Sequence, residues 1–140
     1  MNDTPSIPAL ERDLGAHLEL CRDILTRVQH EHQQLKTARV DNLEDFFRGR
    51  EGMLGALAAA QKQMFTHKSV WMQLDQAERA RHPSVGALIR QNLDLIMKVV
   101  LLDRENEKLL LHHRLVPPKH LPSPERQNPS LIAQRYRANG

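Results

Sequence analysis

The apolar positions of this chain follow a helical repeat from Leu10 to His113 with few interruptions. In its first third, mostly apolar positions recur in alternating steps of four and three: Leu14, Leu18, Cys21, Leu25, Val28, His32 and Leu35. Such spacing is typical of a helix that packs lengthwise against another helix. The repeat therefore predicts a first long helix over residues 9–39.

Two breaks divide the rest of the repeat. At the first, Asp41 and Glu44 have the spacing of a capping box, which predicts a second helix over residues 42–80. At the second, Pro83 disfavours helical geometry in the residue before it and is itself favoured in a first helical turn. A third helix is therefore predicted over residues 84–114. Its main stripe comprises Leu88, Asn92, Leu95, Val99, Leu102, Asn106, Leu109 and His113.

The two ends of the chain differ from this helical body. Residues 1–8 contain two prolines and predict a flexible leader. Residues 115–140 contain five prolines and four basic residues against one acidic residue, which predicts an extended, disordered basic tail. That tail accounts for the whole formal charge of +3, so the helical body is neutral. The predicted fold is all-α, an antiparallel bundle or hairpin of three long helices with coiled-coil-like packing.

Composition narrows the class of protein further. Aromatic residues make up only 4% of the chain, so its core must consist of aliphatic residues and methionine. The single cysteine, Cys21, lies on the first apolar stripe and is predicted to be a small buried hydrophobe rather than a reactive thiol. The N-terminus lacks a signal-peptide pattern, and no apolar run approaches the roughly 20 residues that span a bilayer. We therefore expect a cytoplasmic protein without membrane insertion.

Three glycines, Gly49, Gly52 and Gly55, lie inside the predicted second helix. Each costs a helix roughly 1 kcal/mol relative to alanine. Their spacing favours close approach of a neighbouring helix of the same chain, while a partner-docking groove and local flexibility are alternative interpretations.

The sequence contains no recognisable catalytic or metal-binding motif. His30 and His32 point to opposite sides of a helix, His112 and His113 are adjacent, and neither pair has a further ligand at metal-binding spacing. The aromatic residues are not interleaved with a basic stripe, as single-stranded nucleic-acid binding requires. We expect no enzyme activity, no metal or other cofactor, and no nucleic-acid binding.

Three segments between residues 9 and 114 resemble the FlgN-type flagellar export chaperones. Residues 41–47, Asp-Asn-Leu-Glu-Asp-Phe-Phe, are similar to that family's entry into its second helix. Residues 50–57, Arg-Glu-Gly-Met-Leu-Gly-Ala-Leu, resemble the charged and then leucine-rich continuation. Residues 102–110, Leu-Asp-Arg-Glu-Asn-Glu-Lys-Leu-Leu, resemble the last helix. The glycine strip and the proline-rich tail depart from the family pattern.

This resemblance implies a protein-binding function. Such chaperones hold the amphipathic C-terminal segments of hook–filament junction proteins in the cytoplasm and deliver them to the flagellar type III export apparatus. The broad apolar stripe of the third helix is suited to receive an amphipathic helix, and part of it is expected to remain open in the free protein. The predicted partner-binding residues are Leu95, Val99, Leu102, Asn106, Leu109 and Leu110.

Two other functions remain open at this point. A self-associating coiled-coil scaffold would use the same stripe and form a stable oligomer, whereas the chaperone is expected to be a monomer or homodimer. An adaptor would instead use the C-terminal segment Ser-Leu-Ile-Ala-Gln-Arg-Tyr-Arg-Ala-Asn-Gly as a docking motif.

Overall fold

A computed structural model describes residues 6–113 and residue 115 of the chain. Within these residues the secondary structure is entirely helical: α1 (Ile7–Lys36), α2 (Leu43–Met72), α3 (Gln76–Ala80) and α4 (Pro83–His112). The all-α prediction is confirmed, but the number of helices differs, because α3 is separate from α2. Three of the helices have 30 residues each, and α3 has five.

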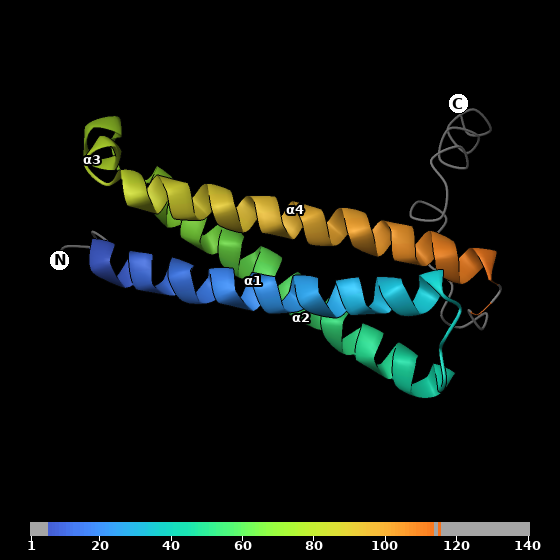
Figure 1. The fold of residues 1–140 in the computed structure, drawn as a ribbon. Helices are drawn as coiled ribbons and strands as arrows, with labels where there is room; N and C mark the ends of the chain where they lie inside the picture. The colour runs from blue at the N-terminus through green and yellow to red at the C-terminus, as the bar shows by residue number, and fades with distance from the viewer. Residues whose placement is uncertain (1–5, 114, 116–140) are drawn as a thin grey trace, which may run out of the picture.

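The three long helices run up, down and up, so α4 is parallel to α1 while α2 is antiparallel to both (Figure 1). Two side-chain pairs fix the parallel register, since His17 bonds Asn92 and His32 bonds Asn106. The interface between α1 and α4 is the most extensive in the structure, and α2 crosses this pair obliquely. The short helix α3 lies at the end where α2 turns into α4.

The buried residues of each long helix follow a heptad repeat, in alternating steps of four and three. In α1 they include Leu10, Leu14, His17, Cys21, Ile24, Val28, Glu31 and Leu35. In α2 they include Phe46, Arg50, Met53, Leu57, Ala60, Met64 and Trp71. In α4 they include Val85, Ile89, Asn92, Ile96, Val99, Asp103, Asn106 and Leu110. Strict heptads on three facing helices are the packing of a coiled coil.

These heptads correct the predicted register. The first predicted stripe shares Leu14, Cys21, Val28 and Leu35 with the buried seam of α1. Between those positions, however, the structure buries His17 and Glu31 where the apolar pattern favoured Leu18 and His32. Leu18 is also buried, at the edge of the seam. At these two positions the predicted stripe lies one residue away from the buried seam, because an apolar pattern does not favour a buried histidine or glutamate.

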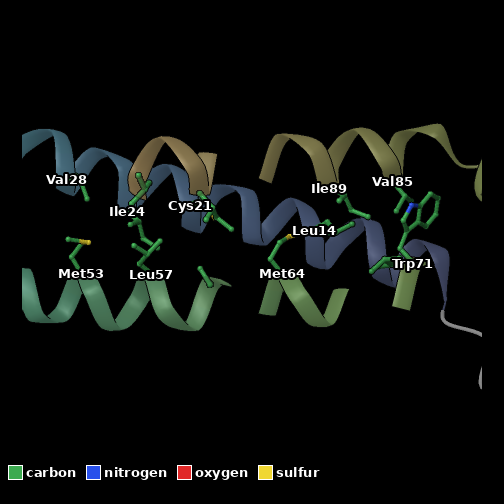
Figure 2. Close-up of a cluster of buried hydrophobic side chains, with 14 residues drawn as sticks. Leu14, Cys21, Ile24, Val28, Met53, Leu57, Met64, Trp71, Val85 and Ile89 are labelled. Atoms are coloured by element: carbon green, nitrogen blue, oxygen red, sulfur yellow. The ribbon is translucent and has the colours of Figure 1, made fainter. Parts of the chain in front are cut away.

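The apolar core forms two separate clusters. The larger one extends from Leu10 and Trp71 at the α3 end to Val28 and Met53 (Figure 2). In Figure 2 the α2 side chains Met53, Leu57 and Met64 point toward α1 and α4, and Trp71 lies beside Val85. The smaller cluster, at the other end of the bundle, consists of Leu35, Phe46, Phe47 and Leu110. Charged residues fill the seam between the two clusters.

Local capping determines where the helices begin and end. Ser6 caps α1, so the helix starts two residues earlier than predicted and includes Pro8 of the predicted leader. α1 ends in a Schellman motif: Ala38 adopts a left-handed φ of 53°, and Arg39 N donates to Gln34 O at 2.9 Å. Asn42, not Asp41, caps α2 by accepting from Asp45 N.

The predicted second helix is broken after Met72. Asp75 accepts a hydrogen bond from Glu78 N at 2.7 Å and so starts α3, because this side-chain bond satisfies an amide that the first turn leaves free. The remaining predictions for residues 1–5 and for the basic tail fall outside the described residues, apart from Leu115.

Candidate partner-binding site

The predicted partner-binding residues of α4 do not form one open surface. Val99, Asn106 and Leu110 are buried between the three long helices, and Asn106 has no exposed surface. Leu95, Leu102 and Leu109 are half-buried and pack against the two apolar clusters. In the structure as it stands, a partner helix could therefore touch only part of this set.

A different set of apolar residues on α4 is exposed. Leu93, Met97 and Leu101 are 37%, 58% and 52% exposed and recur every four residues, so they share one face of the helix. By helical periodicity, Leu95 and Leu102 lie along one edge of the buried seam, and this exposed face lies beyond the other edge. We call Leu93, Met97 and Leu101 the α4 stripe.

Basic residues lie at both ends of the α4 stripe. Arg90 precedes Leu93 by three residues and Arg104 follows Leu101 by three, and both side chains are exposed. Residues three apart are neighbours on a helix surface, so each arginine extends the stripe on the same face. The periodicity of the sequence could have revealed this face, but the broader apolar pattern of α4 obscured it.

The seam of α4 is held in register by two buried asparagines. The side-chain amide of Asn92 donates to Leu14 O at 3.1 Å and to Leu88 O at 2.9 Å, and its Oδ1 accepts from His17 Nδ1 at 2.7 Å. Asn106 repeats the arrangement, donating to Val28 O at 3.2 Å and lying 2.8 Å from Nδ1 of His32. Buried asparagines that bond across a helix–helix interface in this way specify one register of a coiled coil.

A cluster of four charged residues separates the two apolar clusters. Arg50 of α2 donates from Nη1 to Asp103 at 2.6 Å and from Nη2 to Glu107 at 3.3 Å, both on α4. Its Nη1 also lies 3.5 Å from Glu31 Oε2 on α1. All four residues are buried, so the cluster joins all three long helices through one guanidinium.

Three carboxyl groups, those of Glu31, Asp103 and Glu107, contact the guanidinium of Arg50 in this cluster. Burial raises the pKa of Glu31 to about 7, an effect that the charge of Arg50 opposes and the charge of Asp103 reinforces. No sequence pattern indicated this cluster, because Arg50 and Asp103 lie 53 positions apart. Burial likewise raises the pKa of the Cys21 thiol, in keeping with its predicted role as a buried hydrophobe.

Among the described residues, no neighbouring helix backbone packs closely on the glycine strip of α2. A Cβ atom added at Gly49 or Gly55 would meet none of these residues within 4 Å, and one at Gly52 would meet only Arg27 Nη2 at 3.4 Å. The predicted close approach of a neighbouring helix is therefore not seen in the described part of the chain. Gly49 instead lines a groove of about 620 Å³ between α1 and the start of α2, where Arg27 donates to Gly49 O at 3.4 Å.

The described residues contain neither a metal-binding cluster nor a membrane-spanning helix. In residues 6–113, no group of three or more histidine, cysteine, aspartate or glutamate side chains is arranged to hold a metal ion. None of the helices described in the structure combines the length and apolar character needed to cross a membrane. Compared with known protein families, curated proteins and solved structures, the chain matches none.

Proposed function

We propose that this chain is a helix-binding chaperone that holds an amphipathic helical segment of a partner protein on α4. The observation that carries the proposal is the α4 stripe, three large apolar side chains exposed on one face of a long helix. Exposed apolar patches of this kind commonly mark protein-interaction sites. An amphipathic helix binds such a surface through anchors spaced at i and i+4, which matches the spacing of Leu93, Met97 and Leu101.

The charges beside the stripe define the partner more closely. Arg90 and Arg104 lie at the ends of the stripe, and the exposed Asp94 and Glu105 lie beside it. These charges favour a partner helix whose apolar face is flanked by complementary charges of both signs, because such charges steer association and suppress wrong partners. In the form that the FlgN-type resemblance implies, the partners are the C-terminal segments of hook–filament junction proteins in the cytoplasm, and the function is their delivery for flagellar type III export.

The test measures binding of synthetic C-terminal segments of hook–filament junction proteins by isothermal titration calorimetry. Asp in place of both Met97 and Leu101 should abolish binding, because the partner helix would then have to bury two charged side chains instead of two apolar ones. The matched control is Phe65→Asp, which changes a 74% exposed aromatic residue on α2 and should leave binding unchanged. Circular dichroism should show equal helical content in all three proteins.

Light scattering of the free chain distinguishes the competing scaffold function. If the chain forms a stable oligomer that the Met97→Asp and Leu101→Asp pair dissociates, and no segment binds, then the α4 stripe is a self-association surface. Equal peptide binding by the wild type and the double variant would refute the proposed site.

A further inference from the structure

A second surface feature lies at the end of the bundle where α2, α3 and α4 meet. It is a cavity of about 430 Å³, and no carboxylate contributes to its lining. The residues that line it are Trp71, Gln76, Arg79, Ala80, Pro83, Gly86 and Arg90. Two arginines and an indole ring around one cavity form a surface suited to an anion.

Neither arginine is neutralised by the surrounding protein. Among the residues that the structure describes, no carboxylate oxygen lies within 4.0 Å of Arg79 or Arg90. Nη1 of Arg79 contacts only the sulfur of Met72, at 3.1 Å, and its Nε is buried without a hydrogen-bond partner in the described part of the chain. A guanidinium with such poor partners is stabilised by any anion that enters the cavity.

Two carboxylates on and beside α3 have other partners. Glu78 contacts Arg81 at 3.5 Å and His82 at 3.2 Å. Asp75 accepts from Glu78 N as the cap of α3. Within the described part of the chain, the two cavity arginines are thus left without a carboxylate contact.

The backbone around the cavity also favours an anion. α4 begins beside the cavity, and its N-cap residue, His82, makes no side-chain capping bond. The positive end of the α4 dipole therefore lies beside the two arginines, although Pro83 has no amide N–H and Val85 N donates to His82 O at 3.1 Å. At Gly86 a Cβ atom would meet Arg90 Nη1 and Trp71 Cζ2, each at 3.9 Å, so glycine leaves space between the guanidinium and the indole.

We propose that this cavity binds a phosphate group. The two guanidinium charges match the −1.5 to −2 charge that a phosphate monoester carries at pH 7, whereas a carboxylate supplies only one negative charge. Arginine presents paired N–H donors in the planar geometry that suits phosphate oxygens. The apolar wall formed by Trp71 and Pro83 favours a phosphate attached to a planar organic group over the free ion.

The chain provides its own reporter, because Trp71 is its only tryptophan. Fluorescence is measured while inorganic phosphate, phenyl phosphate or acetate is added at constant ionic strength. Saturable changes are expected with both phosphates, tighter with phenyl phosphate, and at least tenfold weaker with acetate. Equal binding of acetate, or a change that never saturates, would overturn the proposal.

Two arginine variants test the contacts directly. Arg79→Gln should weaken phosphate binding about tenfold, which corresponds to about 1.4 kcal/mol. Arg90→Gln tests the same cavity from an exposed position, should Arg79→Gln fail to fold by circular dichroism. Arg104→Gln, an exposed arginine on the same helix but outside the cavity, should bind as the wild type does. Equal affinity in all of these proteins would show that the arginines do not form the site.

This inference does not depend on the chaperone function. The cavity shares Arg90 with the edge of the α4 stripe, but Arg79, Met97 and Leu101 each belong to only one of the two sites. The Met97→Asp and Leu101→Asp pair should therefore lose the partner helix but keep phosphate binding, and Arg79→Gln should do the opposite.

Discussion

Two regions of the bundle fill the same kind of heptad seam with opposite chemistry: the apolar region near α3, and the charged region between the two apolar clusters. Near α3, the seam consists of apolar side chains such as Leu14, Met64 and Val85, which are almost completely buried. Toward the other end, the equivalent positions hold Glu31, Arg50 and Asp103, which are buried to nearly the same degree. Burial alone therefore does not distinguish the two halves; the partners of each side chain do.

The comparison separates stability from specificity. Apolar burial stabilises in proportion to area and tolerates many packings, because it has no directional requirement. A buried ion cluster adds little net stability over apolar side chains, but it heavily penalises any arrangement that leaves a charge unpaired. The apolar region near α3 should therefore hold the helices together. The charged region should admit only one placement of α2 against α1 and α4.

The largest expected loss of stability comes from removing the guanidinium of the charged region. Arg50→Met leaves Glu31, Asp103 and Glu107 without their shared guanidinium, and loss of one partner of a buried ion pair costs about 3–5 kcal/mol. Urea denaturation followed by circular dichroism at pH 7.5 measures the loss. Arg48→Met is the control, because Arg48 pairs with Asp45 on the surface, where an ion pair contributes at most about 1 kcal/mol. Similar losses in both variants would mean that the cluster does not hold α2.

A slightly smaller effect is expected at the apolar end. Met64 is 1% exposed, and Met64→Ala should cost about 2–5 kcal/mol through lost burial and the cavity left behind. The adjacent Phe65, 74% exposed, provides the control, and Phe65→Ala should change stability by less than about 0.5 kcal/mol. Met64→Ala should be equally destabilising at pH 5.5 and pH 8, because methionine does not ionise. A pH-dependent loss of stability in Met64→Ala would contradict the separation of the apolar region from the charged region.

The smallest expected effect is the pH dependence of stability that the Glu31 carboxyl causes. The pKa of Glu31 rises from 4.5 to about 7 on folding, so the folded state binds more protons than the unfolded state between these values. Its contribution to stability is therefore fully present below about pH 4.5 and is lost as the pH rises through about 7. Glu31→Gln, which cannot ionise, should be more stable than the wild type at pH 8.

The measurement for Glu31 is the thermal unfolding midpoint between pH 5.5 and pH 8. The Glu31→Gln variant should lose less stability over this range than the wild type does. Glu19→Gln is the matched control, because Glu19 lies on the exposed side of the same helix and pairs with Arg22. If the profiles of Glu31→Gln and the wild type run parallel, the Glu31 carboxyl does not titrate in this range.

The amino-acid sequence determined the helical class, three long amphipathic segments and the proline at the start of α4, because these depend on local periodicity and local backbone geometry. It also placed Leu14, Cys21, Val28 and Leu35 correctly in the core. It also favoured Val99, Asn106 and Leu110 as partner-binding residues, and the structure buries all three between the long helices.

Only the tertiary structure decided the exact seam and the surfaces that remain exposed. A buried His17, Glu31 or Arg50 is stable solely because its partner comes from another helix, 75 positions away for His17 and Asn92. Periodicity within one helix carries no information about such partners, so it favours apolar neighbours one position away. For the same reason, the Arg79–Arg90 cavity could be identified only once α2 and α3 were in place.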